Sequence, residues 1–159
     1  MRQPRSDDAA PLFAFLGDPY AMQFTQCEPN IAACRDRIDR HESRRVIDGF
    51  SPWTVVRQTD ARIIGWGGLY IDPLDPDWGP EVGYHFEPDS WGKGYASELV
   101  VAALVVADVT AALEKISAFA HVENRASRRV LEKADFAFVR EVPEMNRLLF
   151  ERRSRSSRA

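Results

Sequence analysis

The feature that most constrains this chain is a change of hydrophobic pattern near its middle. Residues 81–86 alternate in character like a half-buried β-strand, and a turn carrying Gly92 and Gly94 follows them. The helix expected next, from Tyr95 to about Ala112, is apolar around much of its circumference, so it has to be buried. A strand, a glycine turn and a buried helix in this order require a fold in which helices cover a sheet.

Helix-like and strand-like segments make up the rest of the sequence. Near the start, Ser6, Asp7 and Asp8 precede a short apolar pattern that ends at Gly17, which is typical of a capped helix. This order of elements gives an α+β (mixed α/β) fold, whose antiparallel sheet becomes parallel across the long buried helix. We predict helices over residues 9–16, 30–45, 95–112 and 125–134, and strands over residues 53–57, 62–71, 81–86, 116–122, 136–142 and 148–151.

Length and composition indicate a single domain. The chain has 159 residues, 45% of them hydrophobic, which is enough for a sizeable core. We place this domain at residues 1–151. Residues 152–159 are basic and rich in serine, with nothing apolar to bury, so we predict a disordered, solvated tail there.

Charge, cysteine content and apolar runs argue against several classes of protein. A formal net charge of -3 gives no general attraction to nucleic acid or to an anionic membrane. Cys27 and Cys34 match no zinc-binding spacing, so we predict no metal, and a reduced, cytoplasmic protein fits them best. The longest apolar run, residues 99–107, is too short to cross a bilayer, and the amino terminus has no signal pattern.

The glycine turn also indicates a ligand. The first turn of a helix carries N–H groups without partners and about half a positive elementary charge, and preceding glycines let a phosphate approach closely. A phosphorylated cofactor is therefore our first hypothesis for this turn. A P-loop is excluded, because Gly94 stands where Ser or Thr must follow Gly92-Lys93, and Glu87 stands at the leading glycine position.

A dinucleotide-binding turn stays open as an alternative. Gly92, Gly94 and Ser97 approximate the GxGxxG pattern, and Glu123 ends the next strand. That acidic residue lies about ten residues later than the usual spacing, and the preceding strand is embedded in hairpins rather than opening a parallel sheet.

Two blocks of sequence resemble a known family. One is WGKGYA at residues 91–96, and the other, about thirty residues later, is NRASRRVLEKADF at residues 124–136. In this order they resemble the two signature blocks of the GNAT N-acetyltransferases, and above all the branch that acetylates the N-terminal alanine of ribosomal proteins. The resemblance covers nearly the whole chain from Arg2. It implies a twisted, mostly antiparallel sheet with one central parallel pair and about four flanking helices.

Three positions and the start of the chain depart from the family pattern. Trp91 replaces the usual Gln or Arg, as is familiar in this branch. Asp135 stands where the family has a glycine after its last helix, which implies a strain of about 1 kcal/mol. Leu131 takes the place of the tyrosine that gives many relatives a proton for the departing thiolate. The first strand, which in relatives ends at the arginine matched by Arg2, is almost absent, so we expect a truncated edge strand.

The resemblance implies a binding site for acetyl-CoA. Backbone N–H groups of the turn would hold the diphosphate, with charge added by Lys93, and the pantetheine arm would pair with the preceding strand. The amide of Phe86 would polarise the thioester carbonyl and stabilise the oxyanion. Asn124 would contact the arm, serve as a helix N-cap, or do both. The cofactor-binding residues implied are Tyr84, His85, Phe86, Gly92, Lys93, Gly94, Tyr95, Ala96, Ser97 and Asn124.

Two residues are our candidates for catalysis, and each could instead be structural. Strand alternation places Glu81, Gly83 and His85 on one face. Through a water, the Glu81 carboxylate could deprotonate an α-amino group, whose pKa is about 7.7 to 8.0. His85 is the alternative base, and His121 a weaker one. Ser127, which the branch suggests in place of the missing tyrosine, would orient a water or hydrogen-bond the thiolate.

We therefore expect an acetyl-CoA-dependent N-acetyltransferase that transfers acetyl directly to a primary amine. The acceptor would be a protein N-terminal α-amino group or a small-molecule amine, with no nucleic acid, membrane or metal involved, and a homodimer is compatible with the sequence. Asp72, Asp75 and Asp77 would attract a cationic acceptor or simply form a turn. A non-catalytic acyl-CoA-binding module and a dinucleotide-binding protein are the alternatives.

Overall fold

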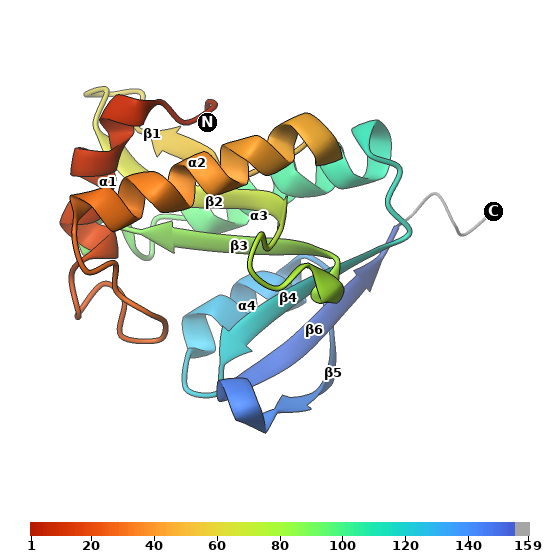
Figure 1. The fold of residues 1–159 in the computed structure, drawn as a ribbon. Helices are drawn as coiled ribbons and strands as arrows, with labels where there is room; N and C mark the ends of the chain where they lie inside the picture. Colours follow the sequence, from red (N-terminus) through yellow and green to blue (C-terminus); the bar gives the residue numbers. More distant parts are fainter. Residues whose placement is uncertain (155–159) are drawn as a thin grey trace.

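The computed structural model describes residues 1–154. Within this range six strands form one sheet in the spatial order β1-β2-β3-β4-β6-β5 (Figure 1). The strands are β1 (Trp53–Val56), β2 (Ile63–Ile71), β3 (Pro80–Phe86), β4 (Lys115–His121), β5 (Ala137–Val142) and β6 (Arg147–Arg153). The α-helices are α1 (Ala9–Leu16), α2 (Ile31–Asp48), α3 (Tyr95–Val105) and α4 (Arg125–Lys133).

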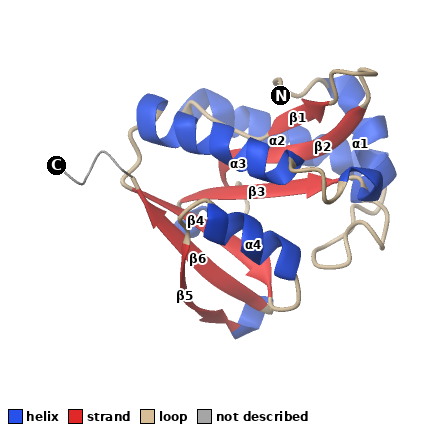
Figure 2. Cartoon of the chain, turned by 180° about the vertical axis from the view of Figure 1, so that it is seen from behind, coloured by secondary structure: helices blue, strands red, loops and turns tan. Residues whose placement is uncertain are grey.

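β3 and β4 form the parallel pair of the described sheet, and the other neighbouring strands are antiparallel. α3 lies in the crossover between these two strands, as the order of elements predicted. Their register contains one pair of partners, Glu81 and Ser117, near the start of both strands. Beyond this pair the strands diverge toward their carboxyl ends (Figure 2). The fold class expected from the sequence is confirmed.

Helices cover both faces of the sheet. α1 and α2 lie over one face (Figure 1), and α3 and α4 lie over the other (Figure 2). One core cluster joins α3 and α4 to the sheet and contains Val82, Val100 and Leu131. A second cluster joins α1 and α2 to Trp66 of β2. β2 is therefore buried on both sides, which is why it is apolar along most of its length.

The boundaries of α2 follow local signals in the sequence. The side chain of Asn30 accepts a hydrogen bond from Ala33 N–H at 2.8 Å, so it caps the helix as its residue type favours. Gly49 ends the helix in the left-handed conformation, with φ of 79°. The helix consequently extends to Asp48, beyond the end predicted at residue 45.

The last part of the long buried helix differs from the prediction. α3 stops at Val105 and a π-helical turn, Val106–Thr110, follows, so a regular helix to Ala112 was wrong. This turn carries Asp108, whose carboxylate accepts two hydrogen bonds, of 2.9 and 2.8 Å, from the guanidinium of Arg152. The pairing ties the end of the helix to β6.

Residues 152–154, which the sequence assigned to a disordered tail, lie within the fold instead. Arg152 and Arg153 belong to β6, and Arg152 is only 5% exposed, because its charge is paired inside the fold. Ser154 is also buried, and its N–H donates to the carbonyl of Glu114 at 2.9 Å. The rest of the predicted tail, residues 155–159, lies outside the described residues.

At the opposite edge of the sheet, β1 has a one-residue partner. Arg2 and Thr54 form an isolated antiparallel bridge, in which their N–H and C=O groups exchange hydrogen bonds of 3.0 and 2.9 Å. Asp8 supports this bridge, because its carboxylate accepts from the Arg2 guanidinium and from the Thr54 hydroxyl, each at 2.7 Å. This bridge occupies the place of the first strand expected from the resemblance.

Asp135, after α4, has the left-handed φ of 65° expected where the family has glycine.

Candidate functional site

The end of β3 has backbone groups that its neighbour β2 does not use. Glu87 N–H donates to the carbonyl of Ile64 at 2.9 Å, so Phe86 belongs to a non-hydrogen-bonded pair of the antiparallel ladder. The N–H of Phe86 therefore points away from β2, toward β4, and the amide groups of Tyr84 do the same by alternation. Because β4 has already diverged at this level, it does not take up these groups. β3 thus presents an open backbone edge.

The turn after β3 enters α3 through two left-handed glycines. Gly92 has φ of 72° and Gly94 has φ of 86°, and no side chain caps the helix. Glu98 N–H donates to the carbonyl of Gly94 at 3.0 Å, which leaves the N–H groups of residues 95–97 without partners inside the helix. A Cβ atom at either glycine would meet no other atom within 4 Å. The turn can therefore receive an anion from outside.

Trp91 links this turn to the open edge of β3. Its indole Nε1–H donates to the carbonyl of Phe86 at 2.9 Å, which holds the turn close to the end of the strand. On its other side, the ring of Trp91 lies 5.5 Å from the ring of Tyr20, measured between centroids. Lys93, at the tip of the turn, is exposed. In the sequence Trp91 stood out only as a departure from the family pattern.

Glu81 lies where β3 and β4 part, and this residue is buried, with 7% of its surface exposed. Burial, followed by the negative charge of Asp72, raises the pKa of this carboxyl to about 8, although the positive charge of Arg147 opposes the rise. A group with this pKa takes up and releases protons near neutral pH, as a general base must.

The other residues that were predicted on this face of β3 are Gly83 and His85. A Cβ atom at Gly83 would lie 2.8 Å from the Tyr70 hydroxyl oxygen, so the glycine makes room for Tyr70 between Glu81 and His85. His85 stacks on Trp66 at 6.3 Å between ring centroids. Burial lowers the pKa of His85 to about 3, and nearby arginines add to the effect. His85 is therefore neutral and a poor base at neutral pH.

The start of α4 faces Tyr84. Asn124 caps this helix by accepting a hydrogen bond from Ser127 N–H at 3.0 Å, which is the N-cap role that its residue type allowed. The hydroxyl oxygens of Ser127 and Tyr84 are 2.9 Å apart. Leu131 is 1% exposed and belongs to the core, so the position of the expected tyrosine carries no polar group.

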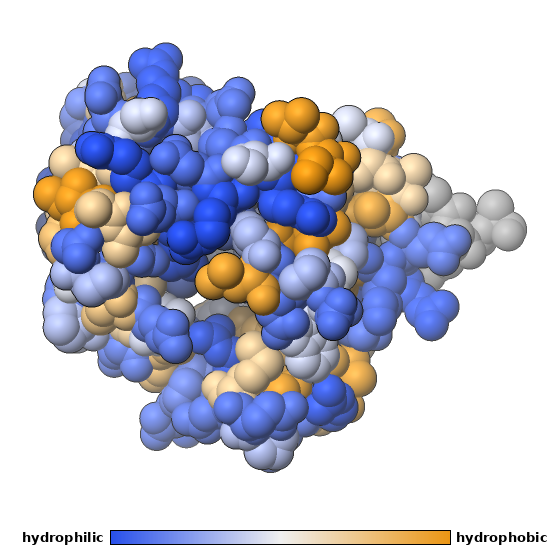
Figure 3. Space-filling view, in the orientation of Figure 1, coloured by the Kyte–Doolittle hydropathy of each residue, from blue (hydrophilic) through white to orange (hydrophobic). Residues whose placement is uncertain are grey.

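The loop between α1 and α2, residues 17–30, contacts both sides of the divergence. Tyr20 packs on Trp91, and Phe24 lies 5.2 Å from the ring of His121 at the end of β4. The surface is hollowed between the part of the molecule that holds α2 and the part that holds β5 and β6 (Figure 3). Sequence reasoning assigned no role to Tyr20 or Phe24, because contacts between such distant residues leave no local pattern.

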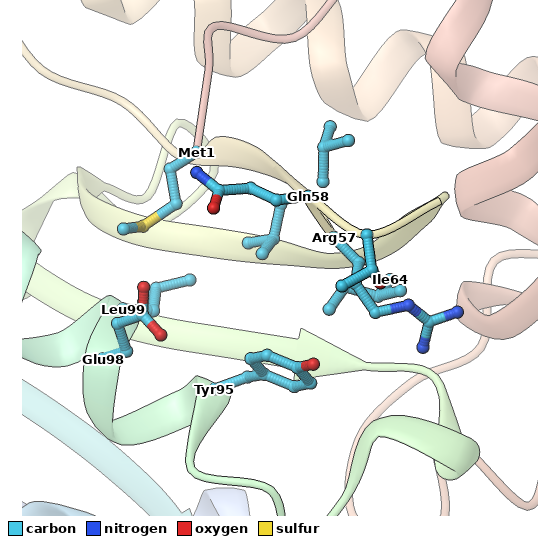
Figure 4. Close-up of a pocket in the computed structure, with 10 residues that line it drawn as sticks. Met1, Arg57, Gln58, Ile64, Tyr95, Glu98 and Leu99 are labelled. Atoms are coloured by element: carbon cyan, nitrogen blue, oxygen red, sulfur yellow. The ribbon is translucent and has the colours of Figure 1, made fainter. Parts of the chain in front are cut away.

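A separate hollow of about 280 Å³ lies between the edge strand β1 and the first turns of α3 (Figure 4). Among its lining residues are Val55, Ile64 and Leu99, and Tyr95 is the one candidate residue there. We assign this hollow no part in the site.

In residues 1–154 no cluster of His, Cys, Asp and Glu side chains could hold a metal, and no helix is long and apolar enough to cross a membrane.

Comparison with known families agrees with the resemblance seen in the sequence. A model of the acetyltransferase (GNAT) domain matches residues 1–137. The chain belongs to the GNAT acetyltransferase family. The predicted family and the predicted enzyme class, an acetyltransferase, are therefore confirmed.

Two bacterial relatives of this acetyltransferase are similar over most of its length. The uncharacterised protein YkkB of Bacillus subtilis is 26% identical over 150 residues, which cover 92% of this chain and 87% of YkkB. The N-acetyltransferase p20 of Bacillus licheniformis, itself uncharacterised, is 24% identical over 139 residues, covering 86% of this chain and 77% of p20.

Solved structures share the fold at lower identity. An acetyltransferase from Agrobacterium tumefaciens superimposes with a TM-score of 0.82 at 19% identity, covering 96% of this chain and 89% of its own. The ribosomal-protein-S5-alanine acetyltransferase of Vibrio fischeri has a TM-score of 0.79 at 16% identity, covering 99% and 94%. The aminoglycoside acetyltransferase AAC(6')-Ib, solved with coenzyme A, has a TM-score of 0.74 at 19% identity, covering 98% and 94%.

Proposed function

We propose that this acetyltransferase uses acetyl-CoA and transfers the acetyl group directly to a primary amine. The proposal rests on one observation above all. The buried Glu81 lies at the point where β3 and β4 part, and the open amide edge of β3 begins there. A base and an oxyanion donor on one strand are what acyl transfer to an amine requires.

The coenzyme would be held mainly by backbone groups. The diphosphate binds the N–H groups of residues 92–97, and Lys93 adds a positive charge beside it. The pantetheine arm pairs with the open edge of β3 at Tyr84, His85 and Phe86, as an added strand would. Asn124 contacts the arm through its side-chain NH₂, since its side-chain oxygen is already engaged by Ser127 N–H. AAC(6')-Ib, which has the same fold, was also solved with acetyl-CoA.

Transfer then needs a polarised carbonyl and a neutral amine. The N–H of Phe86 donates to the thioester oxygen and stabilises the negative charge that develops there. Glu81 accepts a proton from the amine through a water. Its pKa of about 8 matches that of an α-amino group, which is about 7.7 to 8.0, so the proton transfer is close to balanced.

The cysteines favour direct transfer over an acetyl-enzyme. Cys34 is buried among the side chains of α1 and α2, and burial raises the pKa of its thiol to about 11, so it is not a thiolate at neutral pH. Cys27 lies in the exposed loop before α2. Neither thiol lies on β3, on the glycine turn or on α4.

The acidic loop before β3 combines two of the roles considered for it. Asp72 accepts a hydrogen bond from Leu74 N–H at 2.8 Å, and Asp75 accepts one from the indole of Trp78 at 3.0 Å, so both shape the turn. Both also raise the pKa of Glu81. A cationic acceptor would meet this negative charge as it approaches the base.

Release of free thiol from acetyl-CoA tests the proposal. The acceptors are peptides that begin with Ala, Ser or Met, together with polyamines and aminoglycosides, and each is compared with a no-acceptor control. Thiol release with at least one amine, and acetylated product by mass spectrometry, is the expected result. Binding of the coenzyme with no thiol release for any of these acceptors would indicate an acyl-CoA-binding module. Thermal stabilisation by NADH but not by acetyl-CoA would overturn the choice of cofactor.

A further inference from the structure

Tyr84 and Ser127 form a hydrogen bond across the two diverging strands. Tyr84 comes from β3, and Ser127 comes from the first turn of α4, which follows β4 (Figure 2). The Tyr84 hydroxyl oxygen lies 2.9 Å from the Ser127 hydroxyl oxygen and 3.3 Å from the Ser127 carbonyl oxygen. Both residues are half-buried, and the Tyr84 ring packs against the core.

Geometry and acidity decide which hydroxyl donates. Even with the pKa of about 12 that burial gives Tyr84, a phenol is a stronger acid than an aliphatic alcohol and hence the better donor. If Ser127 donated instead, the phenol proton would have the carbonyl at 3.3 Å as its acceptor, a distance longer than the usual one of about 2.8 Å. Tyr84 therefore donates to Ser127, and the Ser127 proton is free to point elsewhere.

We propose that Tyr84 is a positioning residue that turns the Ser127 hydroxyl toward the coenzyme sulfur, so that Ser127 donates a hydrogen bond to the departing thiolate. This inference rests on the proposed function. It supplies what Leu131 cannot, since that side chain is apolar and sealed in the core. The polar group is instead Ser127, earlier on the same helix, and Tyr84 on β3 orients it.

The transfer balances without a proton from Tyr84. The nitrogen of the neutral amine bonds to the carbonyl carbon, the bond between that carbon and sulfur breaks with its electron pair passing to sulfur, the carbonyl re-forms, and the nitrogen loses one proton to Glu81 through water. Burial raises the pKa of Tyr84 to about 12, so the phenol keeps its proton. The thiolate leaves as a hydrogen-bonded anion and takes a proton from water afterwards.

The ionisation of bound coenzyme A tests this role without any acceptor amine. The thiolate is followed by its ultraviolet absorbance while the complex of coenzyme A with the full chain is titrated. In the wild type the bound thiol should have a lower pKa than free coenzyme A. Tyr84→Phe keeps the ring and should raise the pKa of the bound thiol by about one unit, a tenfold change, with unchanged affinity for coenzyme A.

Matched variants separate this role from simple packing. Ser127→Ala should raise the pKa of the thiol as much as Tyr84→Phe, and the double variant no further, because both remove one interaction. Ser127→Thr keeps a hydroxyl and should restore the wild-type value. Ser43→Ala removes an exposed hydroxyl on α2, away from this pair, and should change nothing. If Tyr84→Phe fails to fold, Ser127→Ala and Ser127→Thr carry the same comparison.

The outcomes distinguish this inference from the proposed function. An unchanged thiol pKa in Tyr84→Phe and Ser127→Ala, with coenzyme A still bound, would show that the hydrogen bond only packs α4 against β3 and would overturn the inference. If the wild type lowers the pKa of the bound thiol and these variants abolish that shift, the role of the hydrogen-bonded pair would be supported. If the same wild-type protein acetylated no amine, the proposed activity would be contradicted. In an active enzyme, Tyr84→Phe should lower kcat about tenfold and leave the KM for acetyl-CoA unchanged.

Discussion

Glu81→Gln should make the protein more stable at alkaline pH while it removes most of the activity. In the folded chain the Glu81 carboxyl has a pKa of about 8, against a value of 4.5 for an unperturbed glutamate. Between these two values the folded state holds a proton that the unfolded state releases. The stability due to this group is therefore complete below about pH 4.5 and is lost as the pH rises through 8. A shift of between three and four pKa units corresponds to about 5 kcal/mol.

Urea unfolding of the wild type and of Glu81→Gln, at several values between about pH 5 and pH 9, measures this loss. Glutamine has nearly the same shape and never ionises, so the variant should gain a few kcal/mol on the wild type across this range. Glu144→Gln, at an exposed glutamate, is the matched control and should follow the wild type. A gap between the two proteins that stays constant with pH would refute the raised pKa and remove the reason for choosing Glu81 as the base.

The activity of the same variant gives a second measurement. A general base contributes about 10² to 10⁴ in rate, so kcat/KM of Glu81→Gln should fall by a factor in this range. In the wild type kcat/KM should rise with pH and level off above about 8, where the carboxylate is fully ionised. The variant should lack this rise. An unchanged pH–rate profile in Glu81→Gln would show that another group titrates.

Three further predictions concern the turn, the backbone and the acidic loop. Gly94→Val should weaken coenzyme A binding about tenfold, as measured by calorimetric titration. Gly49→Val is the control, because Gly49 has a similar φ of 79° and equally open space, and this variant should bind coenzyme A normally. Equal effects of the two substitutions would mean that backbone strain alone is responsible. Ala112→Gly should stabilise the fold by up to about 1 kcal/mol in thermal unfolding, because φ there is 48°, whereas Ala102→Gly inside α3 should destabilise it. Asp72→Asn should shift the rising limb of the pH–rate profile to lower pH, and an unmoved limb would contradict the field of this aspartate on the base.

The parts of the site that could be predicted from sequence are those set by local geometry. Alternation along residues 81–86 was enough to separate Glu81 and His85 from Val82 and Phe86, because the period of a strand is two residues. In the same way, two glycines before an apolar helix were enough to predict an accessible helix start, and in the structure both glycines have positive φ. The residue types at these positions carry the information themselves.

What could not be predicted depends on contacts between distant segments. Arg152 resembled a tail residue in the sequence, and its ion pair with Asp108, in the π-helical turn after α3, explains why it is buried in β6. The pKa of Glu81 likewise depends on Asp72 and Arg147, which lie in different parts of the chain. The contacts of Tyr20 with Trp91 and of Phe24 with His121 come from the loop of residues 17–30, whose path the local sequence pattern leaves open.

The point at which β3 and β4 part connects the two halves of the proposed chemistry. Since Glu81 pairs with Ser117 and no later pair follows, the backbone amides of Tyr84 and Phe86 stay open to the coenzyme. The same two residues send their side chains to the opposite face from Glu81, toward α3 and α4. One strand can therefore offer its base to the amine, its amides to the thioester and the Tyr84 phenol to Ser127, because these three groups leave the strand in three different directions. A shift of the register by one residue would exchange the two faces and separate the base from the acceptor side.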